Sequence, residues 1–409
     1  MPSQRDRRAA TLADRLAAPF QRFLAIEASS TILLLLATVL ALAWANSPWR
    51  ASYAALWHAP LAISLGGATL ALSLEHWVND GLMVLFFFLV GMEIKHELVH
   101  GELSTRERAM LPVFGALGGM FAPTALYAAL HAGGPAISGW GVPMATDIAF
   151  AVAALAVFGA RVPPGLKVFL LALAIVDDLG AVAVIAVFYS QGLSLGGLGA
   201  AGGGLALVAL LRAAGVRAYG VYWIVGIGVW LATLHSGVHA TVAGVALGFL
   251  APAHPVDPDR DPRSPLEVLT AALHPWSAFF VMPVFALANA GVPLDPSVLA
   301  DPLARRIALG VALGLFVGKP LGVLLFSWLS VRLRLAALPT GVDFGLILGA
   351  GVLAGIGFTM ALFLTALTFD APPLAAASKL GVMGASVLAT ACGVALLARM
   401  LPRAAPGAR

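Results

Sequence analysis

The chain has 409 residues, of which 60% are hydrophobic and 11% are charged, and its formal net charge at pH 7 is +4. Soluble globular domains carry about 25% charged residues, so this composition excludes a soluble enzyme of the ordinary kind. The single cysteine, Cys392, excludes an internal disulfide and a multi-cysteine metal site.

The hydrophobic residues gather into runs of about twenty, the length at which a helix crosses roughly 30 Å of hydrocarbon. An arginine-containing segment, 1–25, precedes the first run, which we therefore expect to be a retained helix and not a cleaved signal. The pattern predicts an all-α polytopic protein with one membrane domain, 26–400, and a tail, 401–409. Its twelve predicted spans are 26–45, 74–94, 111–130, 140–159, 166–189, 195–211, 219–234, 237–251, 276–290, 307–331, 344–368 and 374–400.

The positive charges are distributed unevenly between the predicted loops. Of the 24 lysines and arginines, one set of alternate segments holds only Arg50, Arg305, Arg306 and Lys379, and nearly all the others fall in the other set. Positively charged loops remain on the cytoplasmic side, so both termini are predicted to be cytoplasmic. Topology thus accounts for the net charge, and nothing in the sequence indicates a nucleic-acid partner.

Two loops between the predicted spans are unusually long. The outer loop, 46–73, has room for a small hairpin with Gly66 and Gly67 as its turn. The cytoplasmic loop, 252–274, is rich in proline and aspartate and is interpreted as a connector.

Four ionisable residues lie inside the apolar runs: Asp147, Asp177, Asp178 and Lys319. Each costs about 2.5 to 3.5 kcal/mol at a helix centre, so their presence needs a reason. A structural ion-pair network is the plain alternative, but three acids against one lysine leave excess negative charge. Carboxylate oxygens suit a hard cation, and protonation is the other way to neutralise them. The cluster therefore predicts a site that exchanges a cation for protons.

Adjacent residues on a helix point about 100° apart, so Asp177 and Asp178 are expected to have different neighbours. One should face the ion together with a partner from another helix. The other should face a neighbour such as Lys319.

Two spans are predicted to be interrupted. Pro143 lies inside the fourth run, and Thr146 suits an N-cap for a restarted helix whose first turn contains Asp147. The eleventh run carries a series of glycines that favours a second break, with close helix packing as the alternative: Gly349, Gly351, Gly355 and Gly357.

Polar residues gather at the inner end of the second run. Glu93, Lys95, His96 and Glu97 are most simply solvated charges, and Glu93, the nearest to the apolar region, is the best candidate for a further role. His239 and His274 could titrate near neutral pH, although a lone histidine is more often a hydrogen-bonding residue.

These residues stand in segments that resemble the NhaA type of sodium/proton antiporter over nearly all the spans. The matching segments are Asn-Asp-Gly-Leu-Met (79–83), Gly-Met-Glu-Ile-Lys (91–95), Ala-Thr-Asp-Ile-Ala-Phe (145–150), Ala-Ile-Val-Asp-Asp-Leu-Gly (174–180), His-Ser-Gly-Val-His-Ala-Thr (235–241), Gly-Lys-Pro-Leu-Gly (318–322) and Gly-Ile-Gly-Phe-Thr-Met (355–360).

The resemblance implies two inverted repeats, about 111–189 and 307–400, whose interrupted fourth and eleventh spans cross. It implies that Asp177 and Asp178 carry the cation and protons beside Thr146, while Asp147 and Lys319 offset the half-helix dipoles. The implied function is pH-regulated, electrogenic export of Na⁺ and Li⁺ against H⁺ across a bacterial inner membrane, with no cofactor and no enzymatic reaction. Family members also form homodimers, partly through a hairpin in the first outer loop, here 46–73.

The resemblance assigns the pH response to the cytoplasmic region that here contains Glu93, His96, Glu97 and His274. His96 stands where the best-known members carry arginine, and Thr270 and Ala271 stand where they carry glutamate and histidine. The resemblance therefore does not predict the pH range over which this protein is active.

Two other classes of membrane protein also place acidic residues within the bilayer. An intramembrane aspartyl protease would require Gly-x-Gly-Asp and Pro-Ala-Leu segments, and neither occurs. A proton-coupled carrier of a small organic solute would require an apolar or aromatic lining and donors for the solute, whereas the residues around Asp178 are small alanines and glycines.

Overall fold

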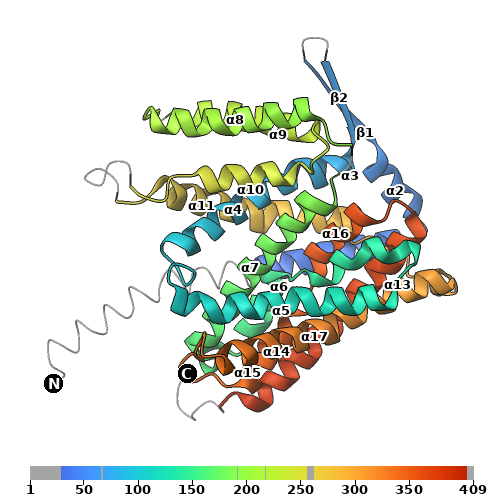
Figure 1. Ribbon diagram of the computed structural model, residues 1–409. Coiled ribbons are helices and arrows are strands. Elements are labelled where there is room, and N and C mark those ends of the chain that lie inside the picture. Colours follow the sequence, from blue (N-terminus) through green and yellow to red (C-terminus); the bar gives the residue numbers. More distant parts are fainter. Residues whose placement is uncertain (1–28, 66–67, 191, 217, 256–261, 403–409) are drawn as a thin grey trace, which may run out of the picture.

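The computed structural model describes residues 29–65, 68–190, 192–216, 218–255 and 262–402, and most of them are helical (Figure 1). The predicted cytoplasmic segment 1–25, the Gly66 and Gly67 turn and residues 403–409 of the predicted tail lie outside the described residues. The first helix covers Ser29–Ala45. The others are α2 (Arg50–His58), α3 (Leu74–His76), α4 (Met83–Val99), α5 (Arg106–Leu130), α6 (Ile148–Ala156), α7 (Pro164–Phe188), α8 (Leu195–Ala213), α9 (Tyr219–Leu234), α10 (Thr241–Leu250), α11 (Pro265–Trp276), α12 (Met282–Asn289), α13 (Pro302–Leu313), α14 (Lys319–Arg332), α15 (Phe344–Ala354), α16 (Phe358–Thr368) and α17 (Pro372–Met400).

The helices have the length and composition of membrane spans. Within the described residues, seven helical stretches are long and apolar enough to cross a membrane, or up to nine if each of two bent pairs counts as one span. Helices α9 and α10 are also apolar but shorter, because the chain turns between them. The prediction of a polytopic membrane protein is confirmed, and the count of twelve spans remains a prediction.

The interpretation of 252–274 as a connector is wrong in its second half. Helix α11 begins at Pro265 and continues through the π-helical turn Ser277–Val281 into α12. Ser264 caps it by accepting a hydrogen bond from the Glu267 backbone, while the Glu267 carboxylate accepts one from the Ser264 backbone. This capping box starts the helix before the first strongly apolar residues.

Two groups of helices pack through glycine contacts. In one group α4 lies against α10, and in the other α5 lies against α14 (Figure 1). A Cβ added to Gly118 of α5 would lie 2.1 Å from the carbonyl oxygen of Gly322 in α14. A Cβ added to Gly244 of α10 would lie 2.4 Å from the carbonyl oxygen of Val84 in α4. Only glycine lets these backbones approach so closely.

The outer loop forms the predicted hairpin. Strands β1 (Pro60–Leu65) and β2 (Ala68–Ser73) pair antiparallel, with Pro60 opposite Ser73, and project from the helices (Figure 1). The indole nitrogen of Trp77 donates a hydrogen bond to the carbonyl oxygen of Leu61 at 2.9 Å, which ties the base of the hairpin to the start of the next helix.

Candidate ion-binding site

The chain leaves helical conformation at two places, and these two breaks lie against each other. Residues 145–147 are extended between the 3₁₀ helix Pro135–Met144 and α6, and residues 355–357 separate α15 from α16, whose axes differ by 48°. The backbone N–H of Asp147 donates to the carbonyl oxygen of Ile356 at 2.6 Å. One break therefore accepts a backbone hydrogen bond from the other, where lipid could supply none.

Asp147 is shared by the two restarted helices. Its Oδ1 accepts a hydrogen bond from the Phe150 N–H of α6 at 3.2 Å, and its Oδ2 accepts one from the Thr359 N–H of α16 at 2.9 Å. The Thr359 hydroxyl also donates to Oδ2. Asp147, and not Thr146 as predicted, is thus the N-cap of α6, because its carboxylate reaches the N–H three residues on. One negative charge faces the positive ends of two helices.

Thr146 points instead toward the acid pair. Its hydroxyl lies 2.9 Å from the carbonyl oxygen of Ala354, at the end of α15, and 2.7 Å from Oδ2 of Asp177. The same carboxylate oxygen lies 2.7 Å from the ammonium nitrogen of Lys319. Thr146 therefore joins the broken α15 to the ion pair.

The ion pair of Lys319 and Asp177 is completely enclosed. Both side chains are 0% exposed, and the Lys319 ammonium also donates to the carbonyl oxygen of Met144, at the end of the 3₁₀ helix. A π-helical turn, Gly314–Gly318, directly precedes Lys319. Within the described residues, Oδ1 of Asp177 is buried without a hydrogen-bond partner.

Asp178 has different surroundings from Asp177. It lines a cavity of about 900 Å³ that Asp147 and Thr359 also line, whereas Asp177 and Lys319 do not line it. Among the described residues, the Asp178 carboxylate has no hydrogen-bond partner. The two adjacent acids therefore face a lysine and a cavity, respectively.

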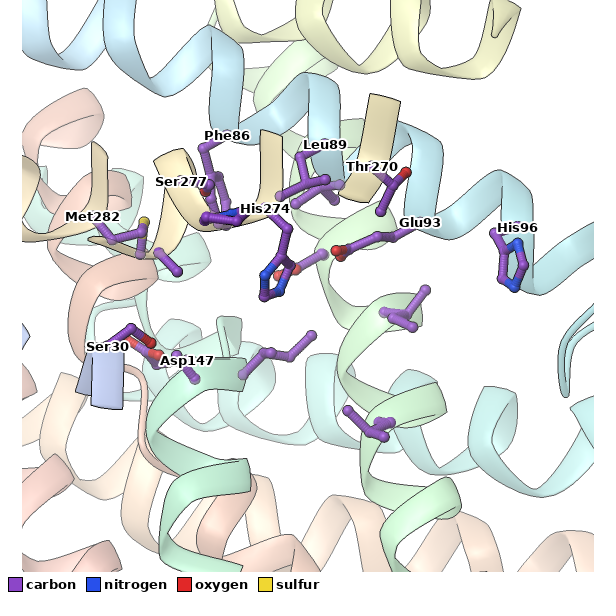
Figure 2. Close-up of a pocket in the computed structure, with 18 of the residues that line it drawn as sticks. Ser30, Phe86, Leu89, Glu93, His96, Asp147, Thr270, His274, Ser277 and Met282 are labelled. Carbon is purple, nitrogen blue, oxygen red and sulfur yellow. The ribbon is translucent and has the colours of Figure 1, made fainter. Parts of the chain in front are cut away.

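The cavity extends from the buried acids to the C-terminal end of α4. His96 and Glu97 line it there, and Figure 2 shows Glu93 and His274 pointing into it from α4 and α11. The structure thus brings every residue predicted for the pH response to the same cavity. His239 does not line it, since its ring is held by Asp80 at 3.0 Å and by Thr241 at 2.8 Å.

Two hydrogen-bond partners in the cluster, one of Asp147 and one of Lys319, were not identified from the sequence. Thr359 bonds Asp147 through both its backbone and its hydroxyl. Its position directly after the glycine-rich break was the available signal. The Met144 carbonyl carried no signal, because every residue has one.

Fold and site together define a helical membrane protein with a buried cluster of acids and one lysine beside a cavity. Residues 21–397 match the family model described as Na⁺/H⁺ antiporter 1. The chain is 52% identical to the Na⁺/H⁺ antiporter NhaA of Acidovorax sp. (strain JS42), over 94% of this chain and 92% of the relative. It is 46% identical to the NhaA of Rhodopirellula baltica, over 95% and 96% of the two chains, and 46% identical to NhaA 2 of Sorangium cellulosum, over 92% and 89%.

The chain belongs to the NhaA family of Na⁺/H⁺ antiporters. Its relatives are transporters of bacterial membranes and not enzymes in the usual sense.

Proposed function

We propose that this protein exports Na⁺ and Li⁺ in exchange for H⁺ at Asp178, with Asp177 as the second member of the site. The observation that carries the proposal is the pairing of charges in the cluster. Asp147 faces two helix N-termini, and Lys319 faces Asp177. Asp178 lies on the cavity wall and makes no hydrogen bond or ion pair with another described residue.

An uncompensated buried carboxylate needs a cation or a proton. The desolvation of an unpaired ion costs several kcal/mol, so the charge of Asp178 favours binding of whichever positive ligand reaches it. Na⁺ and H⁺ neutralise the same charge and therefore compete for it. Asp147 lines the same cavity and the Thr146 hydroxyl bonds Asp177, so their oxygen atoms are the candidate further ligands for a hard cation.

Exchange follows if only a loaded site can change the side that it faces. Sodium bound from one side is then released on the other, where protons replace it. Electrogenic exchange, regulation by pH through Glu93, His96, Glu97 and His274, and inverted repeats about 111–189 and 307–400 are part of this proposal, as the family resemblance implies.

The test is sodium movement in proteoliposomes with an imposed pH gradient. The native protein should move Na⁺ against H⁺, and Asp178→Asn should abolish exchange because the amide carries no charge. Asp301→Asn is the matched control, because Asp301 is an exposed N-cap of α13. Full exchange by folded Asp178→Asn would refute the assignment.

The cavity volume also fits a small organic solute, because ligand pockets span about 300 to 1,000 Å³. A proton-coupled solute carrier is therefore the second candidate. The same assay separates the two, since such a carrier would move no Na⁺ in response to a pH gradient. Family membership favours the ion.

We further propose that two copies of the chain associate through 46–73 in a bacterial inner membrane, with both termini cytoplasmic. Strands β1 and β2 form a two-stranded sheet, and Leu61 and Ile63 on β1 are about half exposed. Open strand edges and apolar side chains favour pairing with a second copy. Deleting 60–73 should convert a cross-linkable dimer into a monomer, and an unchanged dimer would contradict this interface.

A further inference from the structure

The C-terminal end of α4 carries two histidines: His96 lies in its last turn and His100 is its C-cap. The sequence from 96 to 100 is His-Glu-Leu-Val-His, and the His100 N–H donates to the His96 carbonyl oxygen at 2.7 Å. Residues four apart lie on the same helix face, and the two ring centroids are 5.5 Å apart. In many zinc sites, a His-Glu-x-x-His spacing on a helix presents two imidazoles to one ion.

A third imidazole reaches the same place from another segment. His254 follows α10, and its ring centroid lies 5.5 Å from that of His100. The Lys95 ammonium holds this segment beside α4 by donating to the carbonyl oxygens of Phe249 at 2.7 Å and Ala251 at 2.5 Å. These two bonds hold the chain against α4 just before His254.

The three rings are available to a ligand. Within the described residues, no hydrogen bond holds the ring of His96, His100 or His254, and the last two side chains are exposed. As these side chains stand, no three histidine, cysteine or carboxylate groups of the described chain converge on one point. His100 and His254 are exposed and can turn about χ1 and χ2, and this is the movement by which the rings would converge on one ion. The carbonyl end of α4 also favours a cation.

The glutamate of the motif has another task. Oε2 of Glu97 accepts a hydrogen bond from the Glu102 backbone at 2.9 Å and holds the loop that follows α4. In hydrolases with this motif the glutamate is the general base. Its engagement here points to metal binding without hydrolysis.

We propose that His96, His100 and His254 bind one divalent transition-metal ion, with Zn²⁺ as the best match. Imidazole nitrogens suit Zn²⁺, Ni²⁺ and Cu²⁺, and a tetrahedral Zn²⁺ accepts three of them plus water. The bound ion ties the end of α4 to the segment after α10. His96 lines the ion cavity, so a fixed double positive charge there slows the passage of Na⁺.

The binding test uses purified protein without a polyhistidine tag and Zn²⁺ alone, followed by titration calorimetry. We expect one Zn²⁺ per chain. His100→Ala and His254→Ala should each weaken binding by more than the roughly 10–100-fold that loss of an outer-shell partner typically costs. His254→Cys should retain binding, because thiolate is also a zinc ligand.

The control is His235→Ala, which removes an exposed histidine whose ring bonds only its own helix, at the Leu231 carbonyl oxygen. Its Zn²⁺ affinity should equal that of the native protein. Native affinity in both His100→Ala and His254→Ala, or equal losses in the control, would overturn the site.

A transport measurement tests the consequence separately. Zn²⁺ should slow Na⁺/H⁺ exchange by the native protein and should not slow exchange by His254→Ala. Equal inhibition of the two proteins would overturn the proposed effect of this site on transport. Asp178→Asn should still bind Zn²⁺, so failure of the metal site and failure of the proposed exchange mechanism are distinguishable.

Discussion

Replacing Lys319 with methionine tests whether the enclosed ion pair stabilises the site. Methionine has similar length and fits an apolar environment, so the main change is the loss of charge. Asp177 would then be left 0% exposed with Thr146 as its remaining partner, since its Oδ1 already has none within the described residues. Breaking one side of a buried ion pair costs about 3 to 5 kcal/mol. We expect the free energy of unfolding to fall by that amount at neutral pH.

The pH dependence of this loss identifies its cause. A proton can neutralise the orphaned Asp177, so Lys319→Met should regain stability relative to the native protein as the pH falls from about 8 to 5. The double variant Lys319→Met/Asp177→Asn should be more stable than the single variant, because it leaves no buried charge. Arg332→Met is the control, because it removes an exposed positive charge from the same helix.

Unfolding in detergent, followed by circular dichroism at several pH values, measures these differences. Equal stability of Lys319→Met and the native protein at every pH would refute the reasoning. A double variant Lys319→Met/Asp177→Asn that is no more stable than Lys319→Met would also refute the reasoning.

Four further predictions concern the site and its supporting packing. The apparent Na⁺ affinity should weaken as the pH falls from about 8.5 to 6.5. An affinity that stays constant in folded protein would mean that Na⁺ and H⁺ bind at different sites. Lys319→Arg should exchange with unchanged proton coupling, because it keeps the charge; reduced coupling would instead make the lysine a proton carrier. Thr359→Val should lower stability by about 1.5 to 3 kcal/mol through the lost bond to Asp147, and Thr359→Ser should not. Gly118→Ala should cost about 1 to 3 kcal/mol by clashing with α14, whereas Gly384→Ala, which meets open space, should cost little by the same thermal assay.

The sequence was most informative where charge and apolar surroundings conflict. Asp177, Asp178 and Lys319 could be selected because ionisable groups in apolar runs are costly, and the 100° step between adjacent residues separated the surroundings of the two acids. The position of a backbone hydrogen bond carries no such signal. For that reason the contact of Lys319 with the Met144 carbonyl could not be anticipated.

Helix register was harder to read from the sequence. A π-helical turn inserts one residue into a helix and rotates everything after it by about 100°, without changing composition. Three such turns occur among the described residues, and one of them, Gly314–Gly318, precedes Lys319 directly. The face that Lys319 presents therefore follows from an irregularity that hydrophobic periodicity averages out.

The pairing of charges also suggests why the proposed exchange needs no separate gate. An ionised Asp178 is tolerable while the cavity admits water to its carboxylate. Closing the cavity around the bare charge would remove that water and cost several kcal/mol, because Lys319 and the two helix N-termini already face Asp177 and Asp147. Binding of Na⁺ or a proton cancels this cost, so only the loaded site closes readily. In the proposed exchange, the coupling between ion and proton arises from the one carboxylate that makes no ion pair. An added positive charge near Asp178 should therefore weaken exchange even if it stabilises the fold.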